Sequence, residues 1–364
     1  MTLSPNNAEP RTPADQNAVA DAVRQAAQNG TPVFLARRDH ASHPIGPGVV
    51  LSLAALNHVI DHAADDMTIT VEAGVTVGEL QRRLAEKRQR LPVDVTDPDG
   101  TTVGAAVAKN AAGPRQYAFG SMRDYLLGFT AVDGLGRLFS AGGRVVKNAA
   151  GYNLCRLMAG SRGTLALLTQ VTLMVRPMPE SSVFFVCDVP DFQRGERLLA
   201  DLARSPARPV AIEFVAGRPR HGDSMLGPVL AGNVGRLYVG FEGPANEIDW
   251  MVEQLRSAWS AAGATAPMLV PHDRADSLWA WLIDFQADRQ FNVLPGQVME
   301  TAEKLLQSQP ALALEAHAGN GVVRVDEGGV EREQESFASG VEATIAQAIK
   351  DRFDPKNIFP SAEN

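Results

Sequence analysis

The stretch Asp99-Gly-Thr-Thr-Val-Gly-Ala-Ala106 lies in a segment, residues 93–163, in which glycine, alanine, threonine and asparagine dominate. Small side chains allow a backbone to come within hydrogen-bonding distance of a large ligand. Consecutive N–H groups at a tight turn or a helix start form anion sites. Residues 101–104 lead into an alanine-rich segment that ends at Lys109, a pattern that predicts such a helix start.

Similar clusters of small residues recur in the same half of the chain, at 110–113, 118–121, 142–143, 148–151 and 159–164. We expect strands at 127–132, 138–141 and 164–177 between or after them. Several such loops favour an elongated ligand held mostly by main-chain groups, such as a dinucleotide. The alternative, that they are ordinary tight turns in a glycine- and alanine-rich protein, stays open at this point.

Three common motifs are absent from the sequence. No G-x-G-x-x-G follows a predicted strand, so a Rossmann dinucleotide site is unsupported. No G-x-x-x-x-G-K-[ST] is found, which removes the usual P-loop NTPase. A G-x-S-x-G nucleophile elbow is also missing.

The composition is that of an ordinary folded protein. The 364 residues are 45% hydrophobic and 21% charged, and this length allows about two domains. The net charge of −8 argues against binding nucleic acid or a polybasic membrane contact. No apolar stretch approaches the roughly 18 residues that span a bilayer, and residues 1–14 lack the pattern of a secretory signal. Cys155 and Cys187 alone give no disulfide framework and no zinc pattern, so we predict a cytoplasmic protein.

Capping residues predict two helices in the first half. One begins at Asp15 and stops at Asn29-Gly30. The other begins with a capping box of Thr76 and Glu79 and ends near Arg90, because Leu91-Pro92 favours extended backbone. The expected strands around them are 32–36, 49–53 and 68–72.

After Glu180 the pattern is that of alternating strands and helices. The expected strands are 183–186, 210–214, 236–241, 291–294, 311–316 and 322–325. The expected helices are 192–204, 246–261, 277–285, 296–306 and 340–353. This order predicts an antiparallel sheet covered on one face. All four tryptophans, at 250, 259, 279 and 281, are expected on buried helix faces.

The chain resembles the FAD-binding domain of FAD-linked oxidases of the vanillyl-alcohol oxidase and p-cresol methylhydroxylase (PCMH) type. The matching segments, in order, are 71–75, 79–80, 91–92, 102–104, 113–124, 143–152 and 160–177. Residues 112–115 and 156–161, with the short chain, are most similar to the FAD-binding small subunit of bacterial glycolate oxidases. Residues 350–360 are similar to the closing segment of that family.

The resemblance implies an α+β fold: a two-subdomain PCMH-type FAD-binding domain, followed by an α+β cap domain with an antiparallel sheet. It implies a flexible N-terminus at 1–14, the FAD-binding domain at 15–179 and the cap domain at 180–364. The C-terminal segment is expected to return to the FAD-binding domain.

The resemblance also implies a site for non-covalently bound FAD. It places the pyrophosphate near 36–42 and 99–104, the flavin ring near 113–121 and the adenine near 163–171. The predicted cofactor-binding residues are Arg37, Arg38, Asp99, Gly100, Thr101, Thr102, Val103, Gly104, Gly113, Gly120, Ser121, Arg123, Asp124, Gly163, Thr164, Leu168 and Val171.

The sequence departs from that family in its first loop. The loop is glycine-rich in the family, whereas residues 36–42 read Ala-Arg-Arg-Asp-His-Ala-Ser. Cβ atoms and long side chains there hinder a close approach of pyrophosphate, although Arg37 or Arg38 could supply positive charge in place of amide donors.

Histidines offer no clear catalytic site. Residues 317–321, His-Ala-Gly-Asn-Gly, are similar to a shortened form of the H-x-G-D-G-N-x-H element of larger hydroxyacid-oxidising relatives, in which histidines and acids help to bind metal and substrate. Asn320 replaces an acid and 322–324 contain no second histidine, so we predict a turn between strands and no metal. His58 and His62 are interpreted as surface histidines on a strand. We name no catalytic base.

Three functions are consistent with these patterns. The leading hypothesis is an FAD-binding subunit of a glycolate-oxidase-like complex that oxidises a small 2-hydroxy acid, glycolate to glyoxylate, and passes electrons to a non-nicotinamide acceptor. Its partners would be a larger catalytic flavoprotein and an iron–sulfur subunit. The second is a free-standing FAD-dependent 2-hydroxyacid dehydrogenase in which Arg115 or Arg123 clamps the carboxylate. The third is a structural subunit that has lost FAD.

Overall fold

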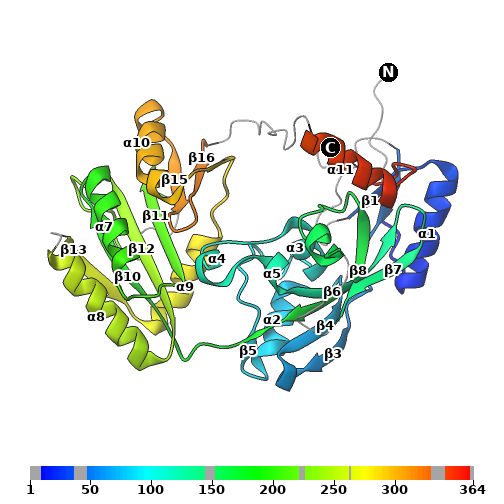
Figure 1. Ribbon diagram of the computed structural model, residues 1–364, viewed down its shortest axis with the longest axis horizontal. Coiled ribbons are helices and arrows are strands. Elements are labelled where there is room, and N and C mark those ends of the chain that lie inside the picture. The colour runs from blue at the N-terminus through cyan, green and yellow to red at the C-terminus, as the bar shows by residue number, and fades with distance from the viewer. Residues whose placement is uncertain are drawn as a thin grey trace. The chain divides into compact units, whose positions relative to one another are not determined.

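The computed structural model describes residues 10–36, 47–143, 152–220, 226–261, 264–328 and 341–360. The chain divides into two compact units (Figure 1). Unit 1 holds the described residues up to Ala112, Ser121–Met178 and the described C-terminal segment, and unit 2 holds Gly113–Gly120 and the described residues from Pro179 to 328. Among the described residues, no helix has the length and apolar character needed to cross a membrane.

Unit 1 is built around a five-stranded antiparallel sheet in the order β3-β4-β8-β6-β7. The strands are β3 (Val59–Ala63), β4 (Thr68–Glu72), β6 (Leu126–Asp133), β7 (Leu138–Gly142) and β8 (Ala166–Met174). Two small pairs accompany this sheet. They are β1 (Val33–Leu35) with β2 (Val49–Leu51), in parallel, and β5 (Gln89–Arg90) with β9 (Arg176–Pro177).

The helices of unit 1 begin where the sequence supplies caps. Asp15 accepts a hydrogen bond from the N–H of Ala18 and starts α1 (Gln16–Asn29), which Gly30 ends in the left-handed conformation. Thr76 starts α2 (Val77–Ala85) in the same way. Both predicted starts are confirmed. The other helices are α3 (Val103–Lys109), α5 (Met122–Tyr125), α6 (Leu154–Met158) and α11 (Val341–Phe353).

Helix α2 ends earlier than Arg90, which corrects the sequence prediction. Arg88 has a left-handed backbone, with φ of 54°, and this ends helical geometry. Gln89 and Arg90 then form β5 and pair with β9. The long strand expected over 164–177 is likewise divided into β8 and β9.

Unit 2 contains a seven-stranded sheet in the order β13-β10-β12-β11-β15-β16-β14, whose neighbouring strands all pair antiparallel. The strands are β10 (Ser181–Val189), β11 (Ala211–Gly217), β12 (Gly235–Gly243), β13 (Thr265–Val270), β14 (Arg289–Asn292), β15 (Ala313–His317) and β16 (Val322–Asp326). The predicted antiparallel sheet is therefore confirmed.

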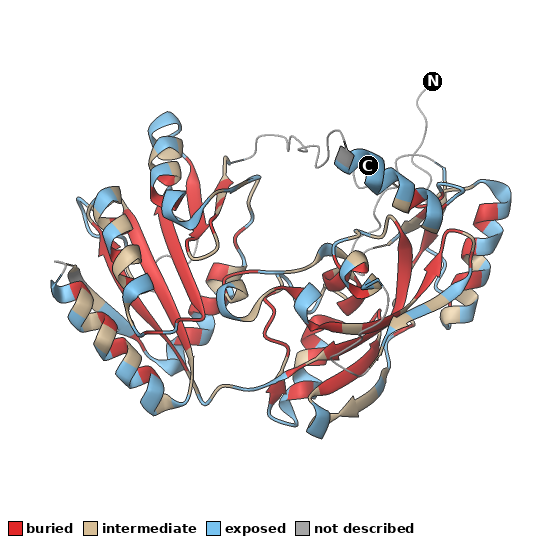
Figure 2. Ribbon diagram, in the orientation of Figure 1, coloured by how far each residue is buried: buried red, intermediate tan, exposed pale blue. Residues whose placement is uncertain are grey.

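Helices cover both faces of this sheet, whereas the sequence led us to expect one. Alternate residues of a strand point to opposite faces. Phe185 and Val239 pack with α7 (Phe192–Arg204), α8 (Ala245–Ala261) and α10 (Val298–Ser308), the helices along one face in Figure 1. Phe184 and Tyr238 pack instead with α9 (His272–Ile283). Figure 2 shows the buried strands between these layers.

The tryptophan prediction holds only in part. Trp259 and Trp279 are buried, but Trp250 on α8 is 52% exposed and Trp281 is partly exposed. Helix α9 also begins five residues before the expected 277, at His272, and α10 follows a short 3-10 turn, η3 (Pro295–Gln297).

Candidate functional site

A cavity of about 520 Å³ lies in unit 1. Its walls come from β1, the residues after β2, Ala73 after β4, segment 100–102, α3, and the residues around the start of β8. The lining residues are Leu35, Ala36, Ser52, Leu53, Ala54, Ala73, Gly100, Thr101, Thr102, Gly104, Ala105, Ala108, Lys109, Arg162, Gly163, Ala166 and Leu168.

The residues of this wall are suited to an anionic ligand that approaches the backbone closely. Ten of the side chains are glycine, alanine or serine, so backbone is accessible over much of the surface. Lys109 and Arg162 are positively charged, and none of the described lining residues is acidic. A local excess of positive charge in a chain of net charge −8 favours a ligand that carries phosphate.

Helix α3 contributes one face to the cavity. Ala105, Ala108 and Lys109 follow one another at helical spacing and therefore share that face. The helix lies close to segment 73–75, since a Cβ added at Gly104 would meet the Cβ of Ala73 at 2.8 Å and its carbonyl oxygen at 3.0 Å. Glycine at 104 thus allows the helix to reach its position.

Several main-chain amides that we expected to bind pyrophosphate already have protein partners. The N–H of Val103 donates to the carbonyl of Val75 and that of Gly104 to the carbonyl of Ala73, at 2.8 and 2.9 Å. The N–H of Gly100 donates to the Asp97 carboxylate at 3.0 Å. These amides therefore already make hydrogen bonds within the protein, and the positively charged side chains of the lining are Lys109 and Arg162. The placement of pyrophosphate beside these amides stays a prediction.

The turn 161–164 forms another part of the wall. Both the N–H and the hydroxyl of Thr164 donate to the carbonyl of Ser161, at 3.0 and 2.7 Å, and so close the turn. The N–H of Arg162 donates to the carbonyl of Ala108 at 2.8 Å, which attaches the turn to α3. Arg162 and Gly163 therefore face the cavity from a structured turn.

The cavity brings together six of the predicted cofactor-binding residues. These are Gly100, Thr101, Thr102, Gly104, Gly163 and Leu168. Arg37 and Arg38 lie outside the described residues. The sequence interpretation did not select Lys109, Arg162, Ser52 or Ala108. Lys109 and Arg162 had a signal in the sequence, because each is a positively charged residue inside or next to a cluster of small residues.

Other predicted residues have structural roles away from the lining. Asp99 forms an exposed ion pair with Arg82 at 2.8 Å. Ser121 and Asp124 cap α5, with the Ser121 N–H donating to the Asp124 carboxylate at 2.9 Å. The N–H of Arg123 donates to the side-chain oxygen of Asn110.

The remaining predicted residues are also outside the lining. Val103 on α3 and Val171 on β8 are fully buried, and Thr164 closes the turn just described. Gly113 and Gly120 belong to unit 2, on either side of α4 (Gln116–Phe119). That these residues contact the cofactor stays a prediction.

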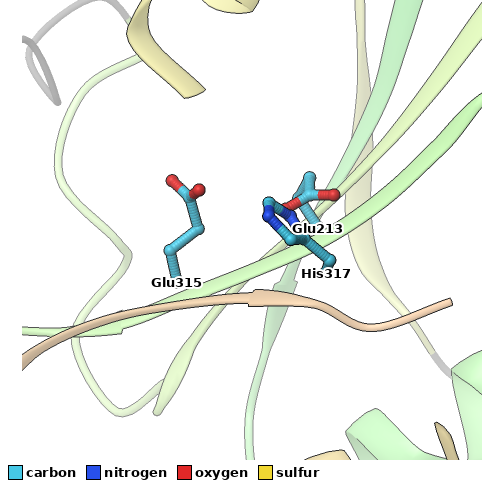
Figure 3. A group of neighbouring side chains, drawn as sticks. All are labelled: Glu213, Glu315 and His317. Atoms are coloured by element: carbon cyan, nitrogen blue, oxygen red, sulfur yellow. The ribbon is translucent and has the colours of Figure 1, made fainter. Parts of the chain in front are cut away.

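Unit 2 contains a buried group of ionisable side chains on β11 and β15. Glu213, Glu315 and His317 each place one potential ligand atom within 4.8 Å of the others. Figure 3 shows Glu213 beside His317, with Glu315 farther along the same strand as His317. The Nδ1 of His317 lies 2.6 Å from Oε2 of Glu213. The predicted turn is present over 318–321, and His317 itself ends β15.

The contacts of Glu315 favour an ion-pair network over a metal centre. Its two carboxylate oxygens accept hydrogen bonds from Arg220 and Arg324. These arginines also donate to the carbonyls of Trp281 and Phe285, at the C-terminal end of α9 and just beyond. A metal ion at Glu315 would have to displace two arginines and would be repelled by them.

Burial and mutual contact shift the pKa values of Glu213 and His317. Burial raises the pKa of Glu213 to about 7, although His317 opposes this shift. Burial alone would lower the pKa of His317, but the Glu213 carboxyl more than offsets it, and the pKa of His317 is raised. The two groups therefore retain a proton near neutral pH. The sequence interpretation missed Glu213 and Glu315.

Comparisons with known proteins agree with the first half of this structure. Residues 11–153 match the family described as FAD binding domain. The D-lactate dehydrogenase of Archaeoglobus fulgidus is 29% identical over 210 residues, 57% of this chain and 47% of that protein. Glycolate oxidase subunit GlcE of Escherichia coli is 32% identical over 169 residues, 46% of this chain and 48% of that protein.

The chain spans about half the length of these curated relatives. A solved structure of alkyldihydroxyacetonephosphate synthase matches the fold with a TM-score of 0.68, over 95% of this chain and 74% of that one, at 17% identity. The fold and the family match define the class: the chain contains a PCMH-type FAD-binding domain. FAD is the cofactor of this class of domain, and the cavity lies largely in the matched segment.

Proposed function

We propose that the cavity of unit 1 binds FAD without a covalent bond. The supporting observation is that small residues, hydroxyls and two cations surround one cavity that lies largely in the matched segment. Lys109 and Arg162 would offset phosphate charge, and Ser52, Thr101 and Thr102 would offer hydroxyl donors. Bound FAD would supply the two-electron acceptor for the oxidation of an alcohol carbon.

The visible absorption spectrum of the freshly purified protein tests this proposal most simply. A flavin spectrum, or a melting temperature that rises with added FAD, is the expected result. Titrations at increasing salt should show weaker FAD binding, because the cations act through charge. A colourless protein whose melting temperature does not respond to FAD would instead support the structural subunit that lacks the cofactor.

We further propose that the chain is the FAD-binding subunit of a glycolate-oxidase-like complex. The complex would oxidise a small 2-hydroxy acid, with glycolate giving glyoxylate, and pass two electrons to a non-nicotinamide acceptor. The likeness to glycolate oxidase subunit GlcE supports this assignment. A larger catalytic flavoprotein and an iron–sulfur subunit would be its partners. The cytoplasmic location stays a prediction.

Glycolate-dependent dye reduction by the chain alone and by the assembled complex tests the subunit proposal. Activity should require the partners. Full activity of the isolated chain would favour the alternative, a free-standing 2-hydroxyacid dehydrogenase, to which the likeness to D-lactate dehydrogenase points. In that alternative Arg115 was one candidate carboxylate clamp, but its guanidinium already binds Glu242 at 2.8 Å.

A further inference from the structure

Lys350 on α11 is a buried lysine that contacts the turn 161–164, which carries the lining residues Arg162 and Gly163. Its Nζ donates three hydrogen bonds: to the carbonyl of Thr164 at 2.8 Å, to the Asp354 carboxylate at 2.6 Å and to the carbonyl of Phe359 at 2.8 Å. An ammonium group has three N–H donors, so all three are used. The contact with Thr164 joins positions 186 residues apart.

Asp354 organises the C-terminal segment around this lysine. Its carboxylate accepts hydrogen bonds from the N–H groups of Ile358 and Phe359, at 3.0 and 2.8 Å. The carbonyl of Ile358 accepts a hydrogen bond from the N–H of Val33, at the start of β1. The segment therefore contacts two walls of the cavity, since Leu35 on β1 and the turn 161–164 both contribute lining residues.

We propose that Lys350 is a positioning residue for FAD binding. It holds the carbonyl of Thr164, and through it the turn that carries Arg162 and Gly163 into the cavity. This inference rests on the proposed FAD site. Coupling between two binding events is reciprocal, so FAD must in turn stabilise the docking of residues 350–359.

Titration of the full chain with FAD, followed by flavin fluorescence, compares three variants with the wild type. Lys350→Met should weaken FAD binding about tenfold, as expected for the loss of a charge-assisted contact. Lys356→Met removes an exposed lysine of the same segment and should bind FAD like the wild type. Leu173→Ala, in a buried part of β8 outside the cavity lining, lowers stability without touching the turn and should leave the FAD affinity unchanged.

Hydrogen exchange of the wild type gives a second readout, which does not depend on whether Lys350→Met folds. Added FAD should slow exchange of the amides of Ile358 and Phe359, outside the cavity lining. Unchanged exchange there, or equal FAD affinity of folded Lys350→Met and wild type, would overturn the inference and leave the FAD site intact. A wild type that does not bind FAD at all overturns both proposals.

Discussion

The Nδ1 of His317 lies 2.6 Å from the Glu213 carboxylate, and each side chain is almost completely buried on the sheet of unit 2. The neighbouring Glu315 carboxylate accepts hydrogen bonds from Arg220 and Arg324. Tyr238 on β12 lies opposite Glu213 in the strand register. A buried carboxyl beside a histidine makes the stability of the protein depend on pH near neutrality.

The direction of this dependence follows from the two raised pKa values. The pKa of Glu213 rises from 4.5 to about 7 on folding, and the pKa of His317 also rises. The native state therefore binds more protons than the unfolded state. The stability that Glu213 contributes is complete below its unfolded pKa of 4.5 and is lost as the pH rises through about 7. The contribution of His317 is lost at pH values above its unfolded pKa of 6.5.

Glu213→Gln should remove most of this pH dependence. Glutamine resembles the protonated carboxyl and does not ionise, so the variant no longer binds a proton at this position on folding. We expect the wild-type melting temperature to fall by a few degrees more than that of the variant between pH 5.5 and pH 8, by roughly the amount that 1–2 kcal/mol produces. Equal pH profiles would contradict the assigned protonation.

An acidic side chain in the cavity should prevent FAD binding. Ala108 lines the cavity on α3, so Ala108→Glu places a negative charge where phosphate is expected. Ala108→Gln has nearly the same size without the charge. We expect Ala108→Glu to weaken FAD binding at least about tenfold more than Ala108→Gln, a difference of roughly 1.4 kcal/mol. Equal losses in FAD titrations would mean that bulk, not charge, decides binding.

The sequence predicted the ends of helices correctly where a single residue strongly favours a helix cap. Asp15 and Gly30 delimit α1, and Thr76 starts α2, because capping depends on residues only a few positions apart. Strand β13 was missed because Pro267 interrupts its pattern. The strand lies at the edge of the sheet, where proline is tolerated.

The site was predicted less completely because its contacts join distant segments. The small-residue motifs indicated Gly104 and Gly163, which line the cavity. They did not indicate that the N–H of Gly104 would donate a hydrogen bond to the carbonyl of Ala73. The pairing of Glu213 with His317 spans 104 residues, and no local pattern in the sequence indicates it.

Arg115 and Glu242 provide a test of buried charge in unit 2. The Nε of Arg115 donates to Glu242 at 2.8 Å, and its guanidinium carbon lies 3.7 Å from the centroid of the Trp279 ring. The Glu242 side chain is only 2% exposed. Arg115→Met removes the positive charge that Arg115 places beside this buried carboxylate and should lower the free energy of unfolding by about 3–5 kcal/mol.

The double variant Arg115→Met with Glu242→Gln separates the two effects. It removes both charges, so it should recover much of the loss measured by urea unfolding. If the loss of unfolding free energy in the double variant equals the sum of the losses in the two single variants, Arg115 and Glu242 do not stabilise each other.

Gly134, in the turn between β6 and β7, supports the C-terminal segment. Its N–H donates to the carbonyl of Phe353 at 2.8 Å. A Cβ at this position would lie 2.2 Å from Oδ1 of Asp354 and 2.6 Å from its Cα, so the backbone must move. Gly134→Ala should therefore cost about 1–3 kcal/mol of stability and also weaken FAD binding, because Asp354 would no longer hold Lys350 in place.

Gly143→Ala is the matched control, since a Cβ there meets no atom within 4 Å. Thermal unfolding and FAD titration of both variants check the prediction. A Gly134→Ala protein that is destabilised yet binds FAD with wild-type affinity would mean that the C-terminal segment stabilises unit 1 without acting on the cavity. If Gly143→Ala weakens binding equally, the effect does not depend on displacement of Asp354.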